Sequence, residues 1–276
     1  MIAKYFKEIV RSPFIVLNNL YLYRHILIHM IIRELKGRFA GSMGGMLWHF
    51  VHPVLMLIIF LFVFVYIFKV RIGTGGNTTL SSIYLMSGLF PWIILAEGLS
   101  RGTSSLIENA NLIQKTFFPT EILTAKAVVT PLLSYGIAMI ILSLYTVFFL
   151  HNSAMVIIIL PIILLMQILF TLGIAFLTST ISVFFRDIMQ FVQVLISFWI
   201  YLTPILYPVD MLPGWARMAM YINPLYPLIS VYQSLLIKGV SCEWNMLFLS
   251  LCWSLSFFVM GAFFFTKLKY EFADWL

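Results

Sequence analysis

Residues 127–185 read AVVTPLLSYGIAMIILSLYTVFFLHNSAMVIIILPIILLMQILFTLGIAFLTSTISVFF, a run of 59 residues that contains no Asp, Glu, Lys or Arg. A membrane-spanning helix needs roughly 20 apolar residues, so this run is too long for one span. The polar triplet His151-Asn152-Ser153 divides it, and Pro161 falls near the start of the second half. The stretch therefore predicts two consecutive membrane-spanning helices joined by a short turn.

The remainder of the chain has the same character. Hydrophobic residues make up 62% of the chain and charged residues only 10%, whereas a soluble domain carries about 25% charged residues. Long uncharged stretches predict six spans in all, over residues 47–68, 80–96, 127–150, 156–185, 188–207 and 246–266. The fold class predicted is an all-α membrane protein with six transmembrane helices, built as a single domain of residues 1–276.

The few charges indicate the orientation of the chain. Of the 17 lysines and arginines, 13 lie in the N-terminal segment, the 97–126 connection, the Arg186 turn and the C-terminal segment. Positive charge concentrates on the cytoplasmic side of membrane proteins, so both termini are expected in the cytoplasm. The net charge of +7 is explained by this arrangement, and no nucleic-acid partner is expected.

Residues 21–38 predict an amphipathic helix that lies on the cytoplasmic surface of the membrane. A polar stripe recurs along it at helical spacing, formed by His25, His29, Arg33 and Lys36. Basic side chains beside an apolar flank suit this surface. The glycines that follow, at 37, 41, 44 and 45, favour a flexible elbow over a Gly41-x3-Gly45 helix contact.

Residues 108–118 predict a short helix on a cytoplasmic connection, parallel to the membrane. The segment combines charged residues with Phe117 and Phe118, and Pro119 is placed to start the next helix. Aromatic residues beside charges indicate docking to a soluble partner. Phenylalanines that dip into lipid explain the same pattern equally well. The adjacent Arg186 and Asp187 form a second cytoplasmic turn, either solvated or bonded to helix ends.

The outer connection 204–239 is apolar but interrupted by prolines. It predicts two half-helices, 212–223 and 228–238, which dip into the outer leaflet. Its tyrosines and tryptophan fit an interfacial belt better than a sugar-binding surface on composition alone. Pro91 is expected to kink the second span.

Catalytic and metal-binding motifs are missing from the sequence. It contains no G-x4-G-K-[ST] loop for nucleotide phosphates and no His-Glu-x-x-His. We therefore expect no catalytic, cofactor or metal site in this chain. A membrane-embedded glycan- or lipid-modifying enzyme is the alternative of another class, and it would need a polar catalytic cluster near the interface.

An ordered set of short motifs carries a family resemblance. They are SGLFPW (87–92), LSR (99–101), NLIQK (111–115), FPTE (118–121), VFFRDI (183–188), TPILYP (203–208) and YINPLYP (221–227). The chain resembles ABC-2 type permeases of polysaccharide exporters, the membrane subunits that export O-antigen, capsule and teichoic acid. Leu123-Thr124 stands where many members have Leu-Pro. A permease of the same fold that exports a drug or lipid is the nearer alternative.

The resemblance implies partners and roles. It implies a homodimer in the bacterial inner membrane that works with two copies of a separate ATPase subunit, which binds ATP and Mg. The substrate implied is an undecaprenyl-linked polysaccharide. Residues 21–38 would be the interface helix, 108–118 the coupling helix and 208–238 the outer gate. Coupling is assigned to Asn111, Leu112, Ile113, Gln114, Lys115, Phe117, Phe118, Pro119 and Glu121. The glycan path or gate is assigned to Phe90, Trp92, Tyr201, Tyr207, Trp215, Tyr221 and Tyr226.

Overall fold

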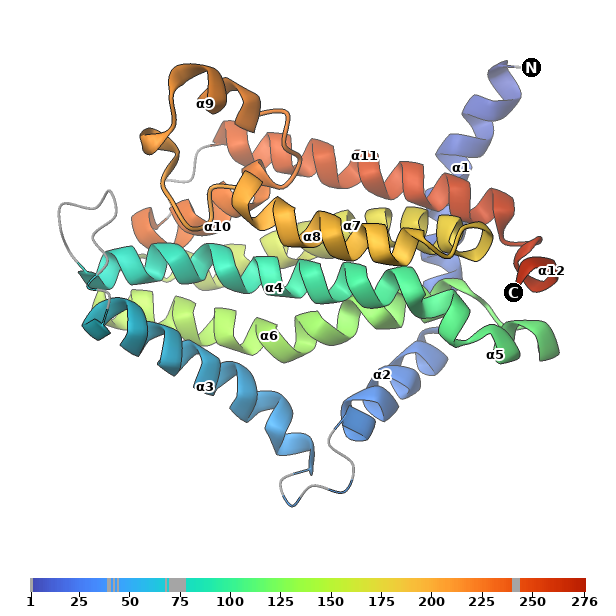
Figure 1. Ribbon diagram of the computed structural model, residues 1–276, viewed down its shortest axis with the longest axis horizontal. Helices are drawn as coiled ribbons and strands as arrows, with labels where there is room; N and C mark the ends of the chain where they lie inside the picture. The colour runs from blue at the N-terminus through green and yellow to red at the C-terminus, as the bar shows by residue number, and fades with distance from the viewer. Residues whose placement is uncertain are drawn as a thin grey trace.

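The computed structural model describes residues 2–38, 41, 43, 45–67, 69, 78–239 and 244–276, and this part of the chain is helical without strands (Figure 1). The α-helices are α1 (Ile2–Leu22), α2 (Arg24–Arg38), α3 (Trp48–Phe62), α4 (Thr78–Glu108), α5 (Ala110–Lys115), α6 (Glu121–Phe149), α7 (Met155–Phe184), α8 (Ile188–Leu202), α9 (Gly214–Met220), α10 (Tyr226–Lys238), α11 (Trp244–Leu268) and α12 (Phe272–Trp275). Three short turns of other helix types complete the set: Gly45–Leu47, Val63–Ile67 and Val209–Met211.

Five helices of the described chain are long and apolar enough to cross a membrane. They are α4, α6, α7, α11 and α3 together with its π-helical extension to Ile67. The spans expected at 47–68, 80–96, 127–150, 156–185 and 246–266 are thereby confirmed as helices. The pair α1–α2 would add a sixth span if it were counted as one, but it bends by 70° at its break.

The expected fifth span, 188–207, is shorter than predicted. Helix α8 ends at Leu202, after 15 residues, which is about 22 Å at 1.5 Å per residue. The cause is Pro204, because a residue before proline is pushed out of the helical region. Thr203 is accordingly extended, with φ −111° and ψ 137°. Length and composition alone therefore do not make α8 a full span.

Helix α4 differs in the opposite direction, since it is much longer than the predicted 80–96. It runs for 31 residues through Pro91 without a break in the helix. Its second half is less apolar but packs closely through small residues. Gly98 and Gly102 lie against α6 and α7, where an added Cβ at Gly102 would come within 2.7 Å of the Ala175 side chain.

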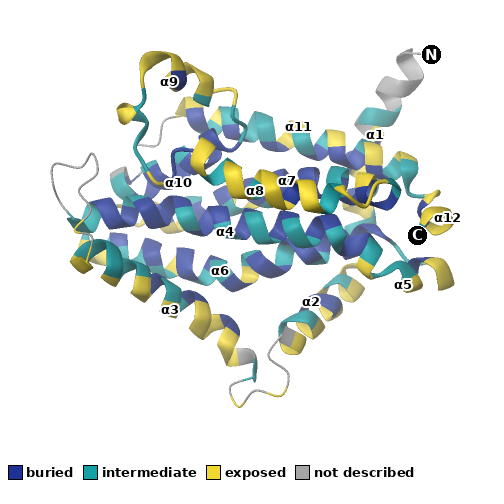
Figure 2. Ribbon diagram, in the orientation of Figure 1, coloured by how far each residue is buried: buried dark blue, intermediate teal, exposed yellow. Residues whose placement is uncertain are grey.

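The helices α4, α6 and α7 form the buried centre of the molecule, and α11 packs against α7 with much of its surface exposed or half-buried (Figure 2). Helix α10 packs against α4, α7 and α11, so it is buried along almost its whole length, as far as Leu236, although it lies outside the long spans. Helices α5 and α12 lie at one end of the bundle, and α9 and α10 at the other (Figure 1). In contrast, α2 and α3 diverge from the bundle toward their connecting loop.

The N-terminal region forms two helices rather than one. Helix α1, which the sequence analysis did not predict, packs on α11, where Val16 is fully buried and Thr266 Oγ1 donates to Ser12 Oγ at 2.9 Å. The helix predicted over 21–38 starts at Arg24, after the bend. Apolar and polar side chains are both exposed on α2. They are separated onto different helix faces more clearly on α1 than on α2.

The glycine elbow is confirmed where the structure describes it. Gly41 and Gly45 adopt positive φ angles of 85° and 47°, which glycine tolerates without strain. An added Cβ at either position would meet no atom within 4 Å, so neither glycine makes a close helix contact within the described residues. Gly44 lies outside the described residues.

Candidate functional site

The α5 segment, defined as residues 109–119, forms a projecting corner at one end of the bundle. Asn109 interrupts the helical path after α4, and its side-chain amide donates to the Ser105 carbonyl at 2.8 Å. Helix α5 then continues for only six residues. Of the side chains on this helix, only Ile113 is buried; Asn111, Gln114 and Lys115 are exposed and Leu112 is half-buried. The predicted helix 108–118 is therefore shorter, since Glu108 belongs to α4.

Two adjacent phenylalanines of this segment have different environments. Phe117 has a relative exposure of 111%, so it contacts almost nothing in its own chain. Phe118 is half-buried and packs against the hydrophobic core. Exposed large aromatic side chains are characteristic anchors of protein interfaces. Phe117 is thus available to a partner, whereas Phe118 and the half-buried Pro119 hold the segment to the bundle.

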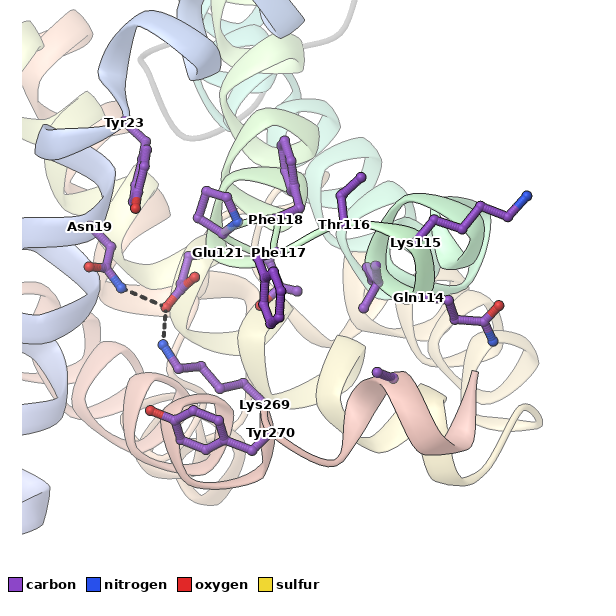
Figure 3. A pocket seen from close by; sticks show the side chains of 14 residues that line it. Asn19, Tyr23, Gln114, Lys115, Thr116, Phe117, Phe118, Glu121, Lys269 and Tyr270 are labelled. Atoms are coloured by element: carbon purple, nitrogen blue, oxygen red, sulfur yellow. Dashed lines mark hydrogen bonds and ion pairs between the residues drawn. The ribbon is translucent and has the colours of Figure 1, made fainter.

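A cleft of about 510 Å³ lies beside this segment (Figure 3). One wall is formed by α5 and the extended residues up to Glu121. The opposite wall is formed by the end of α1, with Asn19 and Tyr23, and by the C-terminal Lys269, Tyr270 and Ala273. Gln114 and Lys115 also line the cleft, from the α5 side. The cleft joins three parts of the chain that are distant in sequence.

Glu121 lies at the base of this cleft and is nearly inaccessible, with a side-chain exposure of 2%. Its Oε1 atom accepts hydrogen bonds from Lys269 Nζ and from Asn19 Nδ2, both at 2.9 Å. A buried carboxylate needs such partners, because an unpaired charge away from water is costly. Glu121 therefore ties the start of α6 to α1 and to the end of α11.

A second group of charges lies where α2 meets α4 and α6. The Glu34 carboxylate is paired with Arg101 and, at 3.2 Å, with Lys126. Arg101 is also 3.4 Å from Glu97, one helical turn earlier. The side chains of Glu34 and Lys126 are 12% and 16% exposed. This charged cluster holds α2 against the bundle and balances two carboxylates with two cations.

The turn between α7 and α8 is simpler. Arg186 and Asp187 are exposed, and Asp187 makes no side-chain bond to the helix that it precedes. No hydrogen bond or ion pair of either side chain is found within the described part of the chain. Of the two interpretations of this turn, the solvated one therefore agrees with the described part of the chain.

At the other end of the bundle, residues 203–238 form a second unit, the 203–238 hairpin, which is organised by Asn223. Its Nδ2 donates to the Leu202 carbonyl and to Thr203 Oγ1, both at 3.0 Å. Its Oδ1 accepts from Trp199 Nε1 at 3.0 Å and from the Leu225 amide at 3.1 Å. One side chain thus replaces the backbone bonds lost where α8 ends, and it fixes α9 and α10 relative to α8.

The aromatic residues expected along a glycan path divide by exposure. Tyr201, Trp215 and Tyr221 are exposed, and Tyr207 is half-buried. In contrast, Phe90 has no exposed surface, and Trp92 and Tyr226 are each 5% exposed. Phe90 and Trp92 are part of the core in this conformation, so neither can contact a glycan without rearrangement. Tyr226 contacts the exposed Tyr221 edge to face at 5.7 Å.

Polar groups that the sequence analysis missed lie inside the bundle and on α8. Gln167 is completely buried, donates to the Pro91 carbonyl at 2.7 Å and accepts from Tyr232 Oη at 2.6 Å. On α8, exposed polar side chains recur at helical spacing on one face, at Gln190, Gln193, Ser197 and Tyr201. This α8 stripe was detectable in the sequence from its spacing.

An all-helical chain with five helices able to cross a membrane is a multi-pass membrane protein. The family model described as ABC-2 type transporter matches residues 26–237. The match covers well over half of the chain, so the chain belongs to the ABC-2 type transporter family.

Individual relatives are similar over almost the whole length. The chain is 33% identical to an O-antigen export system permease protein RfbA of Klebsiella pneumoniae over 252 residues, which cover 90% of this chain and 94% of that protein. A second RfbA protein of the same organism is 32% identical over 253 residues. The RfbA protein of Myxococcus xanthus is 27% identical over 220 residues, or 79% of this chain and 82% of that one.

Proposed function

We propose that this chain is the membrane subunit of an ATP-driven exporter that moves O-antigen-type, undecaprenyl-linked polysaccharide across the bacterial inner membrane. The observation that carries the proposal is the similarity to O-antigen export permeases over 90% of the chain. A separate ATPase subunit, in two copies, would bind ATP and Mg. The chain itself would be a transport subunit and not an enzyme.

The α5 segment is the proposed docking site for the ATPase. Its support is the combination of a fully exposed Phe117 with a surrounding structure that is well packed, through Ile113 and Phe118. An apolar ring held on a firm base can fill a pocket in a partner at low entropic cost. The positive charge of the neighbouring segments supports a cytoplasmic location for this end and for both termini.

A pathway between two copies of the chain is the proposed route. The α8 stripe supports this because Gln190 and Gln193 are exposed on an apolar helix. Gln193 donates to Ser100 of α4, but the remaining polar groups of the two side chains are disfavoured against lipid. Facing a second copy across a hydrated space, the same side chains would contact water and hydroxyl groups. At the outer end, the exposed Trp215 and Tyr221 would contact the emerging sugar rings.

The first experiment is co-purification of the chain with the ATPase encoded beside it, followed by measurement of vanadate-sensitive ATP hydrolysis and of surface glycan in a deletion strain. A stable, active complex that restores surface O-antigen is the expected result. Restored ATP hydrolysis without restored glycan would favour a drug or lipid as cargo. Absence of a complex with any encoded ATPase would contradict the proposal.

The site is tested with Phe117→Ala. We expect this variant to reduce the recovered ATPase by about thirtyfold, since an anchoring aromatic at an interface is worth roughly 2 kcal/mol or more. Phe149→Ala is the matched control, because Phe149 is also exposed (70%) but lies at the opposite end of α6. Equal ATPase recovery from the two variants would refute docking at Phe117.

A further inference from the structure

The C-terminal segment, residues 269–276, is packed into the same end of the molecule as α5. Phe272 is completely buried and contacts Phe265 of α11, with ring centres 5.3 Å apart. Trp275 contacts Phe184 at the end of α7, with ring centres 5.4 Å apart. Helix α12 then contacts α5 itself. The segment is thus anchored in two long helices and touches the projecting one.

Helix α5 depends on neighbours for its position. Six residues are too few for a helix to be stable by itself in water. It buries only Ile113, and the residue at its N-cap, Asn109, makes no side-chain bond to the first turn. On the side of α4, it is held through the Asn109–Ser105 bond. On the other side, the contacts come from α12.

The ion pair between Lys269 and Glu121 closes this arrangement. The two residues are 148 positions apart and come from the end of α11 and the start of α6. Their side chains are 19% and 2% exposed, so the pair is poorly screened by water. Asn19 of α1 donates to the same carboxylate oxygen (Figure 3). Glu121 begins the helix that follows the α5 segment directly, so any displacement of Lys269 reaches that segment.

We infer that Lys269 and the C-terminal segment are positioning elements for the α5 segment, which they hold through the Lys269–Glu121 ion pair and through α12. We call the Lys269–Glu121 ion pair together with α12 the brace. Its role rests on the proposed function, because an ATPase that moves α5 would then displace the ends of α7 and α11 with it. Without the brace, α5 would move while the ends of α7 and α11 stay in place. The consequence would be ATP hydrolysis that no longer drives export.

The test compares Lys269→Met with Lys267→Met. Lys267 lies on the same helical end, but its ammonium group is over the Phe263 ring, at 5.6 Å. Hydrogen–deuterium exchange of the purified full chain reports on the brace without any partner. We expect Lys269→Met to speed exchange of the amides 112–118 by about tenfold, while the control leaves it unchanged. In the complex, we expect export per ATP hydrolysed to fall by a similar factor.

Reversing both charges separates a positioning role from general damage. We expect Glu121→Lys combined with Lys269→Glu to recover slow exchange and coupled export, because the pair is reformed with opposite sense. Export and exchange equal to those of Lys267→Met in the single variant would overturn the inference, as would a doubly reversed variant no better than either single change. If the unaltered chain binds no ATPase, the proposed function fails, and the exchange measurement still decides the brace.

Discussion

Substitution of Gly261 by alanine tests the tightest helix crossing in the molecule. An added Cβ at Gly261 would lie 2.1 Å from the carbonyl oxygen of Gly173, and one at Gly173 would lie 2.3 Å from the Phe257 backbone. Ordinary contacts begin at 3.4 Å. Helices α7 and α11 would therefore have to separate by about 1.3 Å at this point, since neither atom belongs to a flexible side chain.

The cost follows from what this crossing holds together. Phe170 packs on Phe257 with ring centres 5.3 Å apart, and Phe176 packs on Phe265 at 4.7 Å. A gap of about 1 Å removes roughly half of the dispersion energy of such contacts, and aromatic pairs contribute about 0.5–1.5 kcal/mol each beyond burial. Together with overpacking of the backbone, we expect a loss of about 1–3 kcal/mol.

The measurement is unfolding of the purified chain in mixed micelles of increasing SDS content, followed by tryptophan fluorescence. Gly136→Ala is the matched control, because Gly136 is also buried in a long helix, but its added Cβ would meet nothing within 4 Å. That variant gains helix propensity and loses no contact, so its midpoint should equal or exceed that of the unaltered chain. A Gly261→Ala midpoint equal to that of Gly136→Ala would refute the close crossing.

Two further predictions concern the half of the bundle that contains α9 and α10. Asn223→Ala should lower stability by about 1–3 kcal/mol, since it leaves the Trp199 N–H without its acceptor; a shift of the unfolding midpoint checks the loss, and an unchanged midpoint would mean that water replaces the amide. Gln167→Leu and Tyr232→Phe should interact in a double-mutant cycle by about 0.6–1.7 kcal/mol, because each removes the same buried bond; strictly additive effects would contradict that bond.

The sequence was sufficient for most of the membrane-spanning helices. Uninterrupted apolar runs predicted α3, α6, α7 and α11 because lipid leaves the backbone no other way to satisfy its hydrogen bonds. The second half of α4 was missed because Glu97 and Arg101 lower the local hydropathy below that expected of a span. These residues are accommodated because they pair with each other and with Glu34 across a helix interface. Hydropathy does not register such pairing.

Helix α1 was missed for a related reason. It carries Lys4, Lys7 and Glu8 and contains Pro13, features that argue against a long apolar helix. Its stability in the fold comes from packing against α11, and that contact joins residues about 250 positions apart. A local sequence pattern predicts a helix when the pattern alone is enough to stabilise it. The stability of α1 depends instead on its tertiary packing against α11.

The sequence indicated which segment carries the exposed aromatic residue, but not which residues pack against that segment. Exposure of Phe117 follows from an aromatic on a charged connection, and this was foreseen. The half-buried state of Phe118 and the complete burial of Phe90 were not, because adjacent or similar apolar residues are indistinguishable until packing partners are known. The pairing of Glu121 with Lys269 required the three-dimensional arrangement, since nothing in either local sequence refers to the other.

Helix α4 connects the α5 segment to the other end of the molecule. At one end it leads into the α5 segment through Asn109. Toward the other end, Tyr84 donates to the carbonyl groups of Pro204 and Tyr207, at 3.3 and 3.2 Å. A helix of 31 residues is about 46 Å long and stiff along its axis.

Helix α4 is also connected to α10 by buried hydrogen bonds, which do not involve the exposed aromatic residues. The Pro91 carbonyl is bonded to Gln167, which in turn is bonded to Tyr232 of α10. A movement of α5 that shifts α4 along its axis must therefore break these buried bonds or carry α10 with it. Breaking them without water is costly, so displacement of α10 is the favoured outcome. The 203–238 hairpin and the α5 segment are thus connected through α4 by buried hydrogen bonds.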